Sequence, residues 1–229
     1  MTLSKKAFRT IPIQNNFTPI TPRHERGFYC PELWGTPKLT EEQNILSMSR
    51  RTIAIAAALS VLALGSLLIS SCSNPLANNS FNSGLDKYEQ GDYQGAIDDF
   101  TKAIEIHPQN ADAYYNRGTT KGKLKDYQGA IADYNKAISF YPQSSIAYLN
   151  RGIAKSQLED YQGAIADYNK VISIDPQNAV AYANRSILKE KQGDLNGSCS
   201  DGKKAASLGN NQNVRWLNSN NGAWCRNMQ

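Results

Sequence analysis

The chain has 229 residues and a mass of 25.3 kDa, and 40% of its residues are hydrophobic, which allows one or two domains with a modest core. Of its 25 basic and 20 acidic residues, 8 and 4 lie in residues 1–72, so 17 and 16 remain for the rest and the formal charge of +5 is concentrated at the front. Binding to a phosphate backbone needs cations clustered on one face, and this balance argues against a nucleic-acid partner.

Residues 1–47 form the first segment. They contain five prolines and scattered charges without helical or strand periodicity, which predicts a disordered leader. Met48 begins an ordinary export signal by itself, and such signals rarely follow a long polar stretch. We therefore favour translation from Met48, so that residues 1–47 would be absent from the cellular protein, and a start at Met1 stays open.

Residues 48–72 have the layout of a signal peptide or membrane anchor. Arg50 and Arg51 precede an uncharged run of 18 residues, 52–69, and this order is typical of export signals. The run ends in Ile-Ser-Ser-Cys at residues 69–72, which resembles the lipobox of bacterial lipoproteins. The resemblance implies that Cys72 is diacylated on sulfur and becomes the mature amino terminus.

An uncleaved signal anchor is the alternative for the same segment, because about 18 apolar residues just cross a hydrocarbon core. Positive charges stay on the cytoplasmic side of such a segment. Both interpretations therefore place the chain after residue 72 on the non-cytoplasmic face of a bacterial envelope, following a short linker at residues 73–76.

A period of 34 residues dominates the following part of the chain. The hexapeptide DYQGAI begins at Asp92, Asp126 and Asp160, and prolines recur at the same interval. A fixed period of this length indicates stacked supersecondary units that bury their apolar faces against each other. The prolines end helices, and the aspartates stand where a helix N-cap is expected.

The spacing and the residues at fixed offsets resemble the tetratricopeptide-repeat (TPR) family. This resemblance implies an all-α solenoid of three to four helix-turn-helix repeats, with repeats at 77–110, 111–144, 145–178 and 179–208. Small residues at two offsets let paired helices approach closely, and large aromatic residues fill the space between neighbouring repeats. These aromatic positions are Phe100, Tyr134 and Tyr168.

Two departures from the family pattern stand out. The usual Leu of the first helix is Arg117, Arg151 or Arg185, and we interpret these arginines as structural, pairing with Asp99, Asp133 or Asp167 on the second helices. Gly202 stands where an aromatic residue belongs and leaves nothing to pack, which predicts a terminal cap.

The first helices are expected to line the concave face of the stack. An asparagine recurs at the same place in each first helix, and the family resemblance implies that its side chain points into this groove. These asparagines resemble the asparagine ladder of the O-linked N-acetylglucosamine transferases. An amide complements one peptide unit, so the ladder predicts capture of an extended peptide, with selectivity from its neighbours. The predicted groove residues are Asn82, Asn116, Asn150, Asn184, Tyr115, Thr119, Lys123, Leu149, Ile153, Gln157 and Ile187. Alternatively, the asparagines are copied with the repeat and bond to a neighbouring helix.

Residues 209–229 lose the repeat pattern and are expected to form a capping tail. Outside the cytoplasm, Cys199 and Cys225 are most simply a disulfide; two free thiols, or zinc with His107, are the alternatives. Zinc needs four ligands, which this set does not supply.

The sequence therefore predicts a protein-interaction scaffold at the cell envelope that binds an extended segment of a partner protein. An assembly factor for envelope proteins is one such scaffold. The chain shows no nucleophile-base pair, phosphate loop or metal cluster, so we expect no enzyme activity, no cofactor and no small-molecule substrate. A structural or self-associating envelope lipoprotein with an empty groove is the alternative.

Overall fold

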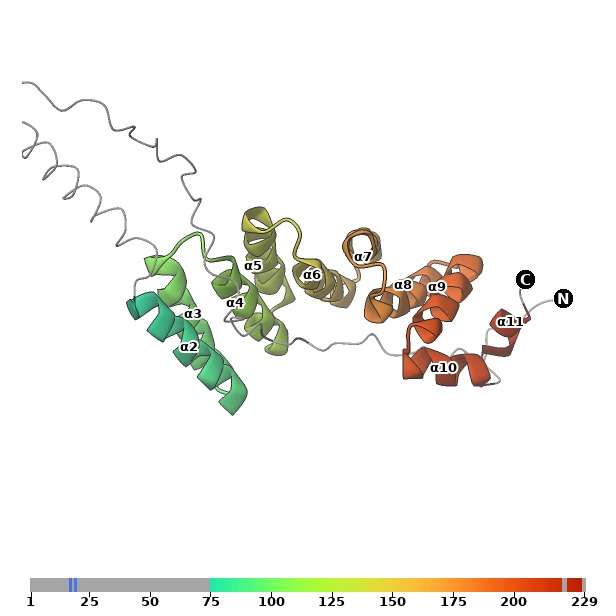
Figure 1. The fold of residues 1–229 in the computed structure, drawn as a ribbon, viewed down its shortest axis with the longest axis horizontal. Coiled ribbons are helices and arrows are strands. Elements are labelled where there is room, and N and C mark those ends of the chain that lie inside the picture. Colours follow the sequence, from blue (N-terminus) through green and yellow to red (C-terminus); the bar gives the residue numbers. More distant parts are fainter. Residues whose placement is uncertain (1–16, 18, 20–74, 220–221, 228–229) are drawn as a thin grey trace, which may run out of the picture.

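The chain forms an elongated stack of helical hairpins (Figure 1). The computed structural model describes residues 17, 19, 75–219 and 222–227, and these residues contain ten helices and no strand. The fold is therefore an all-α TPR-like solenoid, as predicted. The predicted signal or anchor segment, residues 48–72, lies outside the described residues, and so does most of the predicted leader. Among the described residues, no helix is both long and apolar enough to cross a membrane.

Four helix pairs make up the stack, and each first helix is antiparallel to its partner. The first helices are α2 (Pro75–Gln90), α4 (Ala111–Lys123), α6 (Ser145–Gln157) and α8 (Ala179–Lys191). The second helices are α3 (Tyr93–Ile106), α5 (Tyr127–Phe140), α7 (Tyr161–Ile174) and α9 (Leu195–Ser207). Two short helices, α10 (Asn211–Asn218) and α11 (Ala223–Arg226), follow.

Side-chain caps fix where the helices begin. Asp126 accepts a hydrogen bond from the main-chain N–H of Gly129 at the start of α5, at 2.9 Å, and the equivalent aspartates cap α3, α7 and α9 in the same way. Asn110 caps α4 through the N–H of Ala113. Each cap satisfies one of the donors that a helix start leaves unpaired.

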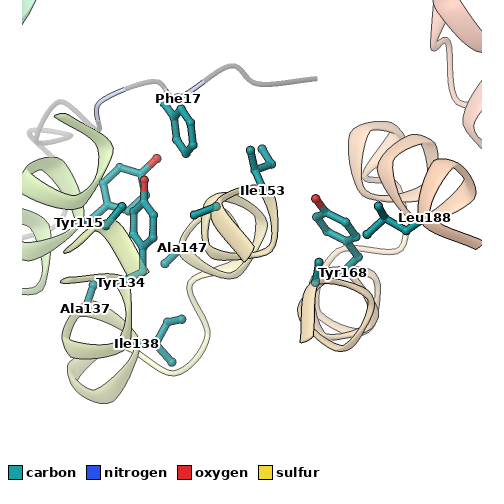
Figure 2. Close-up of a cluster of buried hydrophobic side chains, with 12 residues drawn as sticks. Phe17, Tyr115, Tyr134, Ala137, Ile138, Ala147, Ile153, Tyr168 and Leu188 are labelled. Carbon is teal, nitrogen blue, oxygen red and sulfur yellow. The ribbon is translucent and has the colours of Figure 1, made fainter. Parts of the chain in front are cut away.

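In the core, large aromatic rings of the second helices pack against glycines of the first helices. Phe100, Tyr134 and Tyr168 are fully buried, and Figure 2 shows the two tyrosines within the stack between neighbouring helices. A Cβ added to Gly152 would lie 2.7 Å from Cε1 of Tyr168. Glycine at position 152 is therefore required by close approach, because the Tyr168 ring occupies the space that any side chain would take.

The arginines that depart from the family pattern are structural, as predicted. Arg117 pairs with Asp133 and Arg151 pairs with Asp167, each through two hydrogen bonds between a first helix and its second helix. Arg185 does the same with Asp201. Asp99, also predicted as an arginine partner, pairs with Lys87 and Lys102 instead, because the first repeat carries Ser83 at the arginine offset. Guanidinium and carboxylate match as planar bidentate partners, which fixes the angle between the paired helices.

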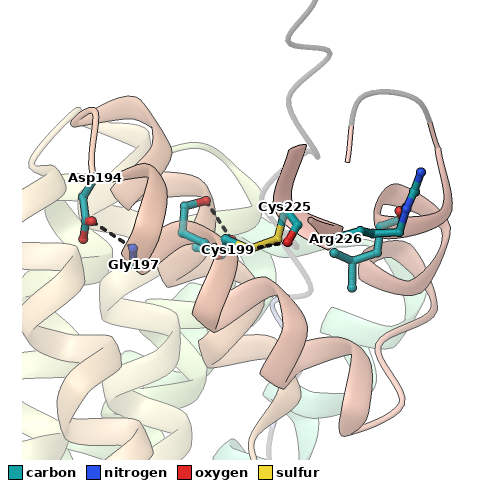
Figure 3. Close-up of a disulfide and its surroundings, with 8 residues drawn as sticks. Asp194, Gly197, Cys199, Cys225 and Arg226 are labelled. Atoms are coloured by element: carbon teal, nitrogen blue, oxygen red, sulfur yellow. Dashed lines mark hydrogen bonds between the residues drawn. A yellow bond between two sulfur atoms is a disulfide. The ribbon is translucent and has the colours of Figure 1, made fainter. Parts of the chain in front are cut away.

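The cap completes the last repeat. Cys199 on α9 and Cys225 on α11 form the disulfide that the sequence predicted (Figure 3). Trp216 of α10 packs beside the bond together with Trp224, with ring centroids 5.9 Å apart. A Cβ on Gly202 would lie 3.5 Å from the Trp216 ring, so Trp216 covers the position where Gly202 supplies no side chain.

Candidate functional site

The first helices line the inner side of the stack. Besides its hairpin partner, each first helix contacts the next first helix: α2 contacts α4, α4 contacts α6, and α6 contacts α8. Successive repeats lie closest together on the side where consecutive first helices contact each other, so the stack curves toward that side and its first helices form the concave face. Function in such an array is sought there.

The predicted groove residues differ widely in exposure. Thr119, Ile153 and Ile187 are buried, Leu149 and Gln157 are half-buried, and Lys123 is exposed. Apart from the exposed Lys123 at the end of α4, these predicted groove residues are apolar or uncharged polar side chains. The Lys191 ammonium lies 4.8 Å above the Tyr161 ring at the far end.

At least one asparagine of the predicted ladder, Asn150, makes a hydrogen bond within the fold itself. Asn116, Asn150 and Asn184 are buried, whereas Asn82 is exposed. The Asn150 side-chain amide donates to the hydroxyl of Tyr115 at 2.7 Å, and this bond links consecutive first helices. A peptide-binding role for the ladder stays a prediction, and at Asn150 a ligand would have to displace or share this bond.

Phe17 is the residue of this face that the sequence did not indicate. It lies in the segment predicted to be a disordered leader, yet only 4% of its surface is exposed. It belongs to the same buried cluster as Tyr115, Tyr134 and Ile153. Figure 2 shows its ring directed toward the space between Tyr115 and Ile153.

Phe17 contacts equivalent residues of two successive repeats. Tyr88 and Gly122 are 34 residues apart and occupy equivalent places on α2 and α4. The Tyr88 hydroxyl donates to the main-chain carbonyl oxygen of Phe17 at 2.8 Å, while the Phe17 ring covers the Cα of Gly122. Ser156 and Glu190 continue the same position on α6 and α8.

Two buried phenols, those of Tyr88 and Tyr115, lie at the Phe17 end of this face. Burial, and secondarily Tyr93, raises the pKa of Tyr88, and burial raises the pKa of Tyr115. Both phenols therefore stay neutral hydrogen-bonding groups at ordinary pH. Burial also raises the pKa of the Glu190 carboxyl at the α8 end.

A metal centre finds no support in the described part of the chain, where no group of three or more His, Cys, Asp or Glu side chains could hold an ion. Cys199 and Cys225 are joined to each other, so the zinc alternative with His107 is not what the structure contains. The arrangement on the concave face offers a hydrogen-bond donor and an apolar surface.

Family comparisons match the repeat region. A sequence model described as "TPR repeat" matches residues 84–125, and one described as "Tetratricopeptide repeat" matches residues 111–144 and again 145–178. No curated protein matches the chain.

Solved structures give the same result. The first TPR of Spaghetti (RPAP3) bound to the HSP90 peptide SRMEEVD is 27% identical, over 53% of this chain and 96% of that one, with a TM-score of 0.52. The Arabidopsis OM64 TPR domain is 28% identical, over 51% and 97%, with a TM-score of 0.50. A crystal structure of MamA is 23% identical, over 72% and 96%, with a TM-score of 0.57, and is similar in fold.

Proposed function

Because residues 84–178 of this chain are tetratricopeptide repeats, we propose that the chain is an interaction scaffold whose concave face binds an extended segment of a partner protein. One observation carries the proposal: a residue from outside the repeats, Phe17, is already buried on this face and hydrogen-bonded through its main chain. A face that accepts this residue offers the contacts that peptide recognition needs, a main-chain partner and a side-chain pocket. We assign no catalytic step to it.

The similar RPAP3 domain is described as bound to a peptide, which supports a peptide-binding role for a related face here. The SRMEEVD peptide is acidic, whereas Tyr88, Tyr115 and Ile153, which lie with Phe17 on the concave face, carry no charge. We therefore expect a different ligand chemistry in this chain.

We place the scaffold at a membrane, on the non-cytoplasmic face of a bacterial envelope. The support is the layout of residues 48–72 and the lipobox-like ending at Cys72. Two acyl chains anchor a protein stably where one does not. Assembly of envelope proteins is the role that such an anchored peptide-binding face would serve.

A photo-crosslinking experiment tests the proposal. A photo-reactive residue replaces Gln157, half-buried on the concave α6, and in a matched variant it replaces Gln128, exposed on α5. In native membranes, position 157 should capture a discrete partner that position 128 does not. Equal capture at both positions, or none at 157, would count against use of the concave face and would favour the structural, self-associating alternative.

A further inference from the structure

Phe17 fills space that the repeats leave open for it. A Cβ on Gly122 would lie 3.1 Å from Cε1 and Cζ of the Phe17 ring. The close neighbours of that Cβ are ring atoms of Phe17, whereas those of Gly118, on the same helix, belong to Ala130, Asp133 and Tyr134 of α5. Gly118 thus serves hairpin packing, and Gly122 serves contact with a residue from outside the repeats.

The same residue is recognised twice. Its ring lies on Gly122 of α4, and its main-chain carbonyl accepts from the Tyr88 hydroxyl of α2. Tyr115, Tyr134 and Ile153 belong to the same buried cluster as Phe17, and Figure 2 shows the Phe17 ring between Tyr115 and Ile153. None of these side chains carries a charge. An aromatic side chain gains the most from such a pocket, because it buries a large area against rings and aliphatic groups.

We propose that Tyr88, Tyr115, Gly122 and Ile153 form a recognition pocket for one aromatic residue of a peptide segment, and that Phe17 of this same chain is its ligand. This inference rests on the proposed function and names the chemistry of its ligand. Tethering favours the internal ligand: Phe17 and Tyr88 are 71 residues apart, and a linked segment competes at a high effective concentration.

Membrane topology determines when the pocket is free. Residue 17 precedes the apolar run 52–69 and the repeats follow it. A chain in which that run crosses a membrane has Phe17 and the repeats on opposite faces, and a chain that begins at Met48 or at Cys72 lacks Phe17. In either form the pocket is available to an aromatic residue of a partner.

The test uses the full chain in detergent and a labelled peptide of residues 10–24, TIPIQNNFTPITPRH. Fluorescence anisotropy compares the wild type with Phe17→Ala. Phe17→Ala should bind the peptide at least tenfold more tightly, because its pocket is not occupied from within. A peptide with alanine in place of the phenylalanine should bind at least tenfold more weakly to the same variant.

Two pocket variants, made on the Phe17→Ala background, make the test specific. Gly122→Leu fills the place of the ring with a strong helix former and should abolish peptide binding, with the helical circular dichroism retained. Tyr88→Phe keeps the ring and removes the hydroxyl, so peptide affinity should fall several-fold even if Gly122→Leu fails to fold.

Equal binding of the phenylalanine and alanine peptides, or equal affinity of the wild type and Phe17→Ala, would overturn the aromatic pocket and its internal ligand. Capture of a partner at position 157 would still stand in that case, so the two failures are distinguishable. A wild type that sediments as a dimer while Phe17→Ala sediments as a monomer would overturn the internal ligand in favour of a second copy.

Discussion

Arg151 donates to both carboxylate oxygens of Asp167, from Nε to Oδ2 at 2.9 Å and from Nη2 to Oδ1 at 2.5 Å. The same arginine donates through Nη1 to Asn135 of the preceding repeat at 2.7 Å and lies 5.1 Å above the ring of Tyr148. Lys155 adds a second cation to Asp167 at 2.9 Å. One guanidinium therefore joins two second helices across a first helix.

Replacing Asp167 with alanine should lower the free energy of unfolding by roughly 2–3 kcal/mol. The change leaves Arg151 and Lys155 without their carboxylate in a nearly dry site, and the loss is smaller than for a fully buried pair because both cations are partly exposed. Urea denaturation followed by circular dichroism measures it. Asp98→Asn, at an exposed position, is the control and should change stability by less than about 0.5 kcal/mol. An equally small effect of Asp167→Ala would contradict a stabilising role for the pair.

The first repeat should show its own acid sensitivity through Asp99. Burial alone would raise the pKa of this carboxyl, but hydrogen bonds from Lys87, Ser83 and Lys102 outweigh burial and hold it well below its usual value. A depressed folded-state pKa contributes stability that is present above the unfolded value near about 4, and is lost as the pH falls through the folded value.

The unfolding free energies of wild type and Asp99→Asn should therefore differ most at neutral pH and converge below about pH 4. Urea titrations at pH 7, 4 and 2.5 measure this difference. A constant difference across the three pH values would show that the loss comes from packing and not from the charge. Asp98→Asn, one residue earlier and exposed, is expected to follow the wild-type curve.

Much of the fold could be predicted because each repeat carries its own boundaries. The same 34-residue interval separates the prolines, the capping aspartates and the large and small core residues. In each of three repeats, local helix propensity and core packing therefore indicate the same helical hairpin. The pairing of Arg151 with Asp167 was predictable for the same reason, since an arginine on a half-buried face needs a partner on the helix that it faces. A capping tail was predicted, but its specific contact between Trp216 and Gly202 was not, because Trp216 lies beyond the repeat pattern.

The candidate site was less predictable, because its contacts do not repeat. Phe17 lies in a polar, proline-containing stretch and meets Tyr88 across 71 residues, a contact that no periodicity reports. Asn150 recurs in step with the repeat, but its partner Tyr115 is replaced by Leu149 and Ala183 in the next two repeats. A glycine at position 122, where Tyr88 and Ser156 carry side chains, was the one local signal available.

Replacing glycine with alanine should lower the stability of the protein at Gly152 and raise it at Gly202. At Gly152 the new Cβ would lie 2.7 Å from the fully buried Tyr168 ring, so overpacking should cost about 1–3 kcal/mol and exceed the gain in helix propensity. At Gly202 the nearest atoms lie 3.4–3.5 Å away, so the helix gain of up to about 1 kcal/mol should remain. Thermal melting of the two variants beside wild type compares them. A stabilised Gly152→Ala would mean that the ring moves freely, against the close packing found here.

Reduction of the Cys199–Cys225 bond should destabilise the end of the stack. The bond closes a separation of 26 residues, for which loop entropy corresponds to about 3 kcal/mol. The double variant Cys199→Ala, Cys225→Ala should lose about this much in urea denaturation, with Trp216 and Trp224 reporting the cap by fluorescence. Adding a reductant should then change the wild type and leave the double variant unaffected. Equal stability of the two proteins without reductant would show that the bond adds nothing to the packing around Trp216.

Lipidation at Cys72 should appear in the intact mass of protein extracted from membranes. Export with cleavage before Cys72 predicts a mass that starts at this residue and exceeds the polypeptide by two or three acyl chains, since a single chain binds a membrane only marginally. Cys72→Ser should abolish the added mass, whereas Cys30→Ser, which changes another cysteine in the part of the sequence before the repeats, should not. A mass that starts at Met1 would overturn the lipoprotein proposal, and it would leave Phe17 in the chain. A mass that starts at Met48 without acyl chains would instead indicate the uncleaved anchor, with the concave face free of its internal ligand.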